Sequence, residues 1–184
     1  MAELIFKILL LGDGSVGKTT LRYRYLGKEY TSGYYATLGA DFALKEILYK
    51  SHRIRFQIWD LAGQAHFRPL NKSFFLGAQG ALVLFDLTNE KTMKNVQVWA
   101  EEFWRNNGKG KSMPIIVIGN KKDLRGTVPG SISTDDGMAA VARLSSDTNV
   151  PIPYLETSAK NGENIELAFE TLTDHYLRSF EKSS

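Results

Sequence analysis

Near-continuous apolar runs recur along the chain at intervals that suit buried strands. Residues 4–11, 81–86 and 114–119 consist mostly of Leu, Ile, Val, Ala and Phe. Runs of this length are typical of parallel strands that are covered on both faces. A shorter run at 152–156 predicts a further strand of the same kind.

Two segments show a different period. Residues 41–49 and 53–60 alternate between apolar and polar positions. Alternation with a period of two is the pattern of a strand with one face in the core. The polar residues 50–52 form a short connection, so the two segments are predicted to pair as an antiparallel hairpin.

Helical spacing of apolar residues fills most of the intervals between the strands. Ser133 and Asp136 add a capping-box pattern at the start of one such segment. Strands that alternate with helices form parallel βαβ units with right-handed crossovers and helices on both faces of the sheet. The predicted helices cover residues 16–26, 74–78, 90–107 and 133–145, and the last begins at Asn161 or Gly162 and continues to about residue 180.

The predicted fold is therefore α/β, a single domain over residues 1–184 with a six-stranded, mostly parallel sheet and one antiparallel strand. Residues 31–39 and 61–71 show neither period and are predicted loops. The second loop contains Gly63 and Pro69, and we expect it to move.

The composition mainly excludes certain classes of protein. Hydrophobic residues make up 43% of the 184 residues, which is enough for the core of one domain. No run of apolar residues is long enough to span a membrane. Glu3 and Lys7 interrupt the N-terminal apolar run, so no signal peptide is predicted. We therefore expect a cytoplasmic protein, peripheral at membranes at most.

Cysteine is absent from the sequence, and residue 2 is Ala. These two facts exclude disulfides, thiolate metal sites and N-myristoylation, and they predict no lipid anchor on this chain. The net charge of +3 is small. A solvated surface is the simpler interpretation of it, and a weak patch for anionic membranes is the alternative. We expect no nucleic-acid partner.

A phosphate-binding loop follows the first predicted strand. Residues 12–19 read Gly-Asp-Gly-Ser-Val-Gly-Lys-Thr, the complete Gly-x-x-x-x-Gly-Lys-Thr pattern between a strand and a helix. Glycines let consecutive N–H groups turn toward a phosphate, and the helix N-terminus favours the same anion. Lys18 would add a positive charge for the β- and γ-phosphates, and Thr19 a hydroxyl for Mg²⁺. The alternative, a chance glycine-rich turn, leaves the flanking strand and helix unexplained.

A second motif indicates which base is bound. Asn120-Lys121-Lys122-Asp123 directly follows the strand that ends at residue 119. The Asp123 carboxylate can accept two hydrogen bonds from the N1–H and the exocyclic amine of guanine, a donor pair that adenine lacks. Asn120 would tie this loop to the phosphate loop, and the Lys121 stem would lie on the base. Asp123 therefore argues against an ATPase or a kinase, and a plain polar turn is the other alternative.

These motifs together resemble the Ras superfamily of small GTPases, most closely its Rab branch, over residues 5–177. Residues 58–64 (Ile-Trp-Asp-Leu-Ala-Gly-Gln) are similar to the second switch of that family. Residues 37–42 (Thr-Leu-Gly-Ala-Asp-Phe) are similar to the Rab form of the first switch, and residues 156–160 (Glu-Thr-Ser-Ala-Lys) to the last guanine loop. The resemblance implies a P-loop NTPase G domain.

The resemblance also implies a function. The chain would be a molecular switch that binds GTP or GDP with Mg²⁺ and slowly hydrolyses GTP, which changes the conformation of residues 31–42 and 60–75. The implied catalytic residues are Gln64, which would orient the attacking water, with Lys18, Thr37 and Gly63. The implied Mg²⁺ ligands are Thr19 and Thr37, with Asp60 acting through water. The implied nucleotide-binding residues are Asp13, Gly14, Ser15, Val16, Gly17, Lys18, Thr19, Thr20, Tyr30, Thr37, Gly63, Asn120, Lys121, Asp123, Ser158, Ala159 and Lys160.

Partner proteins follow from the same resemblance. No arginine of the chain stands out as a finger in cis, so a GTPase-activating protein is implied, with an exchange factor and effectors that read the switches. Phe42, Trp59 and Phe74 lie where Rab proteins have an aromatic triad, and they are candidate effector contacts. Core packing is the alternative for these three side chains. A monomer is expected.

The chain departs from the Rab pattern in the second switch and at its end. Leu61 stands where Rab proteins have Thr, Ala65 where they have Glu, and the Arg-Pro-Leu of residues 68–70 resembles the Arf branch. These changes leave a second hypothesis open, a nucleotide-locked scaffold without useful turnover. The sequence given ends at Ser184 without the cysteines of a Rab tail. Either a lipidated tail follows in a longer protein or the protein is never lipidated, and a homologue without lipid is the expectation.

Overall fold

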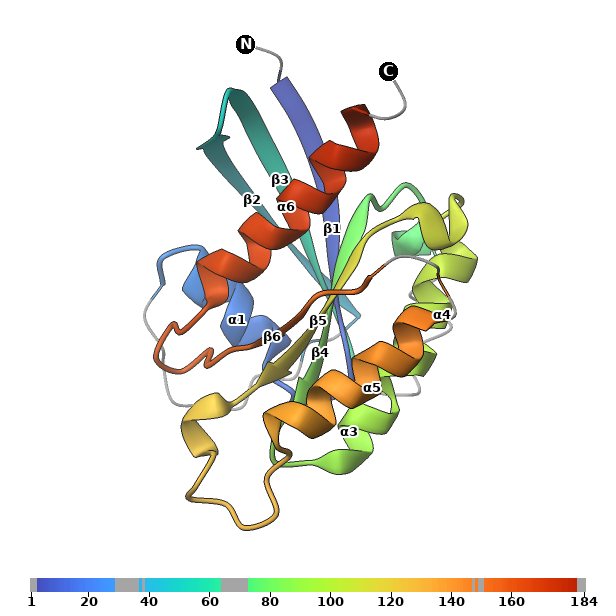
Figure 1. The fold of residues 1–184 in the computed structure, drawn as a ribbon. Helices are drawn as coiled ribbons and strands as arrows, with labels where there is room; N and C mark the ends of the chain where they lie inside the picture. Colours follow the sequence, from blue (N-terminus) through green and yellow to red (C-terminus); the bar gives the residue numbers. More distant parts are fainter. Residues whose placement is uncertain are drawn as a thin grey trace.

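One sheet carries all the strands in the part of the chain that the structure describes (Figure 1). The computed structural model describes residues 3–28, 37, 39–63, 73–146, 148 and 151–181. The strands lie in the order β2-β3-β1-β4-β5-β6, and β2 alone runs antiparallel to its neighbour. The predicted sheet is thus confirmed. The strands are β1 (Glu3–Leu11), β2 (Ala40–Tyr49), β3 (His52–Leu61), β4 (Gly80–Asp86), β5 (Ile115–Asn120) and β6 (Tyr154–Glu156).

Helices cover both faces of the sheet. Helices α1 and α6 lie on one face, and α3, α4 and α5 lie on the other (Figure 1). The α-helices are α1 (Lys18–Tyr25), α3 (Glu90–Lys94), α4 (Val96–Asn106), α5 (Thr134–Ser146) and α6 (Ile165–Glu181), and the short 3₁₀ turns are η2 (Gly110–Ser112) and η3 (Lys122–Leu124).

Strand β1 supplies side chains to two separate cores. Ile8 and Leu10 belong to the core under α1 and α6, and Leu9 and Leu11 belong to the core under α4 and α5. All four side chains are fully buried because successive residues of a strand point to opposite faces. Burial on both faces is the physical reason why residues 8–11 are all apolar.

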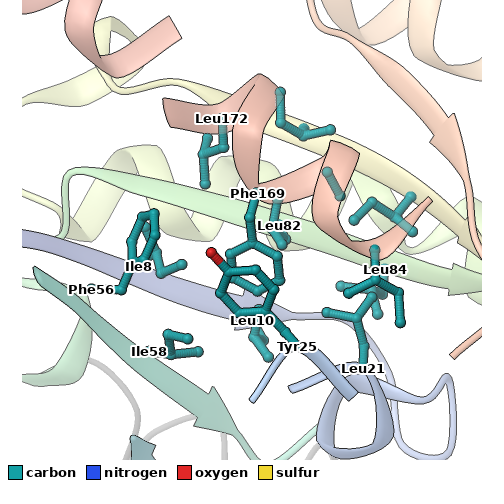
Figure 2. Close-up of a cluster of buried hydrophobic side chains, with 14 of the residues drawn as sticks. Ile8, Leu10, Leu21, Tyr25, Phe56, Ile58, Leu82, Leu84, Phe169 and Leu172 are labelled. Atoms are coloured by element: carbon teal, nitrogen blue, oxygen red, sulfur yellow. The ribbon is translucent and has the colours of Figure 1, made fainter. Parts of the chain in front are cut away.

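The core under α1 and α6 is built around stacked aromatic rings. The rings of Tyr25 and Phe169 are parallel within 2°, with centroids 3.5 Å apart, and Figure 2 shows both beside Leu10 and Leu172. The Phe6 ring stacks in the same core on that of Tyr176, with centroids 4.2 Å apart. This packing fixes α1 against the sheet, and with it the end of the phosphate loop from which α1 begins.

Several predicted helix boundaries were wrong, and backbone conformation explains them. The helix predicted from residue 16 begins at Lys18, because Ser15 and Gly17 have φ values of 65° and 100°. The helix predicted from residue 161 begins at Ile165, because Gly162 and Asn164 also have positive φ. Left-handed residues cannot be part of a right-handed helix.

The segment 90–107 is two helices and not one. Helix α3 ends at Lys94 and α4 begins at Val96, with Asn95 between them. The Asn95 side chain donates to the carboxylate of Asp13 at 2.6 Å, so this junction is held by a residue far away in the sequence.

The predicted capping box is present, since the Ser133 hydroxyl accepts a hydrogen bond from the Asp136 N–H at 3.1 Å. The strand predicted from residue 152 begins at 154.

Candidate nucleotide-binding site

The phosphate loop joins the end of β1 to the start of α1 through backbone conformations that favour glycine. Gly12 and Gly17 have φ values of 135° and 100°. A Cβ on Gly12 would lie 2.2 Å from the carbonyl oxygen of Leu84, and one on Gly17 would lie 2.2 Å from Nδ2 of Asn120. Both positions therefore require glycine, for conformation and for space.

Lys18 is the buried cation of this loop. Its side chain is 6% exposed, and its Nζ donates to the carbonyl oxygens of Gly12 and Asp13 at 2.8 and 2.7 Å. Burial lowers the pKa of Lys18 to about 8, against the opposing influence of the Asp60 and Asp13 charges. The ammonium group thus lies inside the curve of the loop, where a phosphate group would meet it.

Three oxygen-bearing side chains converge beside Lys18. The Thr19 hydroxyl donates to Oδ2 of Asp60 at 2.5 Å, and it lies 3.0 Å from the Thr37 hydroxyl. The Thr37 hydroxyl is 3.5 Å from the same carboxylate oxygen. Two hydroxyls and a carboxylate are hard oxygen donors, which is the set that Mg²⁺ prefers.

Asp60 is the buried acid of this group. It is fully buried, and its Oδ1 has no hydrogen-bond partner among the described residues. Burial raises the pKa of Asp60, while the Thr19 hydrogen bond and the charges of Lys18 and Arg22 act in the opposite direction. A free carboxylate oxygen next to two hydroxyls fits a divalent cation. Within the described part of the chain, no cluster of three or more His, Cys, Asp or Glu offers another metal site.

One buried amide ties the predicted base-binding loops to the phosphate loop. Nδ2 of Asn120 donates to the Val16 carbonyl at 2.8 Å. Its Oδ1 accepts from the Thr157 hydroxyl at 2.9 Å and from the Ala159 N–H at 3.0 Å. Asn120 is 1% exposed, so each of these bonds is shielded from water. Segments around residues 16, 120 and 158 are thereby held as one unit.

The neighbouring side chains of these loops hold one another in place. The Ser158 hydroxyl donates to Oδ1 of Asp123 at 2.5 Å. Lys121 has a left-handed backbone with φ of 68°, and its Nζ lies 2.6 Å from Oδ2 of Asp86. The carbonyl of Lys160 accepts from Arg24 at 2.7 Å. The hydrogen bond from Ser158 thereby restricts the orientation of the Asp123 carboxylate.

Gly63 brings the start of the second predicted switch against the phosphate loop. A Cβ on Gly63 would lie 2.3 Å from the carbonyl carbon of Asp13 and 2.4 Å from the carbonyl oxygen of Gly12. Backbone occupies this space, so no side chain fits.

Comparison with known proteins agrees with this geometry. A family model described as the Ras family matches residues 7–178. The chain is 38% identical to the Ras-related protein Rab7 of Pisum sativum over 180 residues, which are 97% of this chain and 85% of that protein. It is 38% identical to the GTP-binding protein YPTC5 of Chlamydomonas reinhardtii over 177 residues, 95% of this chain and 84% of that protein. It is 39% identical to the GTP-binding protein yptV5 of Volvox carteri over 177 residues, 95% and 83% of the two chains.

The chain belongs to the Ras family. It is a Rab-like small GTPase, and small GTPases are hydrolases of GTP. None of the helices in the described ranges has both the length and the apolar character needed to cross a membrane.

Some of the predicted site residues lie outside the described residues of this Ras-family chain. These are Tyr30, Gln64, Ala65 and the Arg-Pro-Leu segment 68–70. The structure does bring together Lys18, Thr19, Thr37, Asp60 and Gly63 at the phosphate end. At the other end it brings together Asn120, Asp123, Ser158 and Ala159.

The three candidate effector contacts form a continuous row of rings. The centroid of the Trp59 ring lies 4.9 Å from that of Phe42 and 5.2 Å from that of Phe74. Phe42 is 43% exposed, whereas Trp59 and Phe74 are half-buried against the core under α4 and α5. The row therefore serves packing at its inner end and offers a surface at its outer end.

Two polar features of the site were not predicted from the sequence. The Asp13 carboxylate accepts hydrogen bonds from Asn95 and from Nε1 of Trp99 at 2.6 and 2.8 Å. Arg22 is buried on α1 and pairs with Asp41. Trp99 lies in the segment 90–107, which was predicted as a helix from its apolar spacing, and nothing in that spacing signals the bond. Arg22 follows the apolar Leu21 directly in the sequence, but helical spacing alone does not indicate that its charged side chain is buried.

Proposed function

We propose that this chain is a guanine-nucleotide switch that binds GTP or GDP with Mg²⁺ and hydrolyses GTP slowly. One observation carries the proposal: the Asn120 side chain bonds the Val16 carbonyl of the phosphate loop and two groups of the last guanine loop. The loop that would select guanine and the loop that would hold the phosphates are thus joined directly, as a site that binds both ends of one nucleotide requires.

The residues at the phosphate end have separate tasks in this proposal. Thr19, Thr37 and Asp60 would hold Mg²⁺, which would neutralise charge on the β- and γ-phosphates. Lys18 already points into the loop and would steady the leaving oxygens. Gln64 would orient the attacking water. Catalysis of this kind comes from positioning and electrostatic stabilisation, with no covalent intermediate on the protein.

Switching would follow from contacts that need the γ-phosphate. The Thr37 hydroxyl is within hydrogen-bond distance of Thr19, and Gly63 lies against the backbone of the phosphate loop. Their N–H groups would contact a γ-phosphate that GDP lacks, so hydrolysis would release residues 31–42 and 60–75. A GTPase-activating protein, an exchange factor and effectors would act on these segments, in trafficking or membrane-associated signalling.

The base preference can be tested with Asp123→Asn. An amide at this position loses the carboxylate that accepts both guanine donors, so affinity for GDP should fall about 100-fold and affinity for xanthosine diphosphate should rise. Fluorescent-nucleotide binding measures both. Asp135→Asn, which changes an exposed acid in the first turn of α5, is the matched control and should leave both affinities unchanged. Unchanged GDP affinity in Asp123→Asn would remove the basis for guanine selection.

The scaffold without turnover is the second candidate, and Leu61 motivates it. Leu61 cannot donate a hydrogen bond, and it is 1% exposed in the core under α4 and α5. Its burial supplies a packing reason for the departure from the Rab pattern, which weakens the case for lost catalysis. Single-turnover phosphate release decides between the two: we expect Gln64→Leu to be at least about tenfold slower than the parent chain. Equal rates would favour the scaffold.

A further inference from the structure

Arg22 is a buried cation next to the proposed metal site. It lies on α1 one helical turn after Thr19, and it is 2% exposed. Its Nη2 donates to Oδ2 of Asp41, while Nε and Nη1 are buried without a hydrogen-bond partner in the described part of the chain. A guanidinium usually uses its whole fork of donors when it is buried. Hydrogen bonding therefore explains only part of its placement.

The carboxylates that face Arg22 come from adjacent strands. Asp41 of β2 and Asp60 of β3 are directly opposed in the antiparallel register. Opposed residues of an antiparallel pair point to the same face, here the face that α1 covers. Two like charges in this arrangement destabilise a sheet. Arg22 pairs directly with Asp41, and its charge, together with that of Lys18, also opposes the charge of Asp60.

The electrostatics of the three groups agree with this arrangement. Burial alone would lower the pKa of Arg22, but the hydrogen bond to Asp41 and the charges of Asp60 and Asp41 raise it above its ordinary value. Salt screens this interaction less than a surface pair because Arg22 and Asp60 are both buried.

We propose that Arg22 is a positioning residue of the metal site that supplies Asp60 with part of the positive charge that Mg²⁺ would otherwise supply. A fixed cation beside Asp60 opposes the approach of a second cation, so it weakens Mg²⁺ binding. It also keeps Asp60 paired when Mg²⁺ leaves. Half-maximal retention of the nucleotide would thus require a higher free Mg²⁺ concentration than with a neutral side chain at this position. This inference rests on the proposed binding of a guanine nucleotide with Mg²⁺.

The test is the release of a fluorescent GDP analogue from the full chain across a range of buffered free Mg²⁺ concentrations. Arg22→Met keeps length and removes charge, and it should lower the Mg²⁺ concentration that gives half-maximal retention by about tenfold. Arg22→Lys keeps the charge and should stay within about twofold of the parent. Asp41→Asn leaves Arg22 to face Asp60 alone and should raise the midpoint about threefold. Arg105→Met, an exposed cation on α4, is the control for net charge.

A merely structural role gives a different pattern. In that case Arg22→Met and Arg22→Lys would both release GDP faster at saturating Mg²⁺, and lysine would not rescue the midpoint. An unchanged or raised midpoint in Arg22→Met overturns the inference. If Arg22→Met does not fold, as judged by circular dichroism, an unchanged or lowered midpoint in Asp41→Asn overturns it. Failure of the parent chain to bind GDP at all would instead contradict the proposed function.

Discussion

Glu156, at the end of β6, is held beside the guanine loops by charge as well as by shape. Arg125 donates to its two carboxylate oxygens at 2.6 and 2.7 Å, and the Tyr154 hydroxyl donates to it at 3.0 Å. Burial alone would raise the pKa of Glu156, but these hydrogen bonds and the Arg125 charge lower it below its ordinary value. The folded chain therefore holds the ionised form more tightly than the unfolded chain does.

The pH dependence of the free energy of unfolding should show the lowered pKa of Glu156. A carboxyl with a lowered folded pKa stabilises the fold above its ordinary pKa of 4.5, and the contribution is lost as pH falls through the lower folded value. Glu156→Gln should reduce the free energy of unfolding by about 2 kcal/mol at pH 7, and by progressively less below pH 4.5. Urea denaturation measures both, with the exposed Glu101→Gln as control. A difference that grows on acidification would contradict the assignment.

The packing of α5 against β6 requires a residue that helix propensity disfavours. Gly137 lies inside α5, where glycine is unfavourable by about 1 kcal/mol relative to alanine. A Cβ there would lie 2.2 Å from the Tyr154 hydroxyl oxygen and 2.5 Å from Cζ of the same ring. The ring cannot retreat freely, since it stacks on Phe85 and its hydroxyl is bonded to Glu156. The glycine thus sets how closely α5 approaches β6.

Gly137→Ala is accordingly predicted to destabilise the protein. Helix propensity by itself predicts stabilisation, but the clash with Tyr154 should lower the free energy of unfolding by about 1–3 kcal/mol. In a Tyr154→Ala background the same change should be neutral or stabilising by about 1 kcal/mol. A double-mutant cycle in urea measures the coupling. Stabilisation by Gly137→Ala in the parent chain would show that the ring moves at little cost.

The whole molecule gathers its site at one edge of the sheet. The phosphate loop follows β1, Asp60 lies near the end of β3, Asn120 ends β5, and Ser158 follows β6. The carboxyl ends of parallel strands meet at the same edge, which is where ligands bind in open α/β sheets. The Asn120 amide ties the end of β5 to the phosphate loop. The Asp13 carboxylate ties the phosphate loop to the start of α4.

The fold and the chemistry of the site were predictable where the determinants are local. The run 4–11 is apolar except for Lys7 because residues 8–11 of β1 are buried on both faces of the sheet, and residues 12–19 carry the glycines that the loop backbone needs. Helix ends were less predictable, as at Asn164, because a left-handed residue other than glycine leaves little trace in the sequence.

The sequence by itself determined the succession of strands and helices along the chain, the phosphate loop and the guanine motif. Periodicity and short motifs depend on residues that are close together in the sequence. Only the tertiary structure decided which distant charges meet. Asp13 accepts from Trp99, 86 positions further along the chain, and Arg22 faces two carboxylates that become neighbours only through the pairing of β2 with β3. Such contacts depend on the packing of elements, which no local pattern encodes.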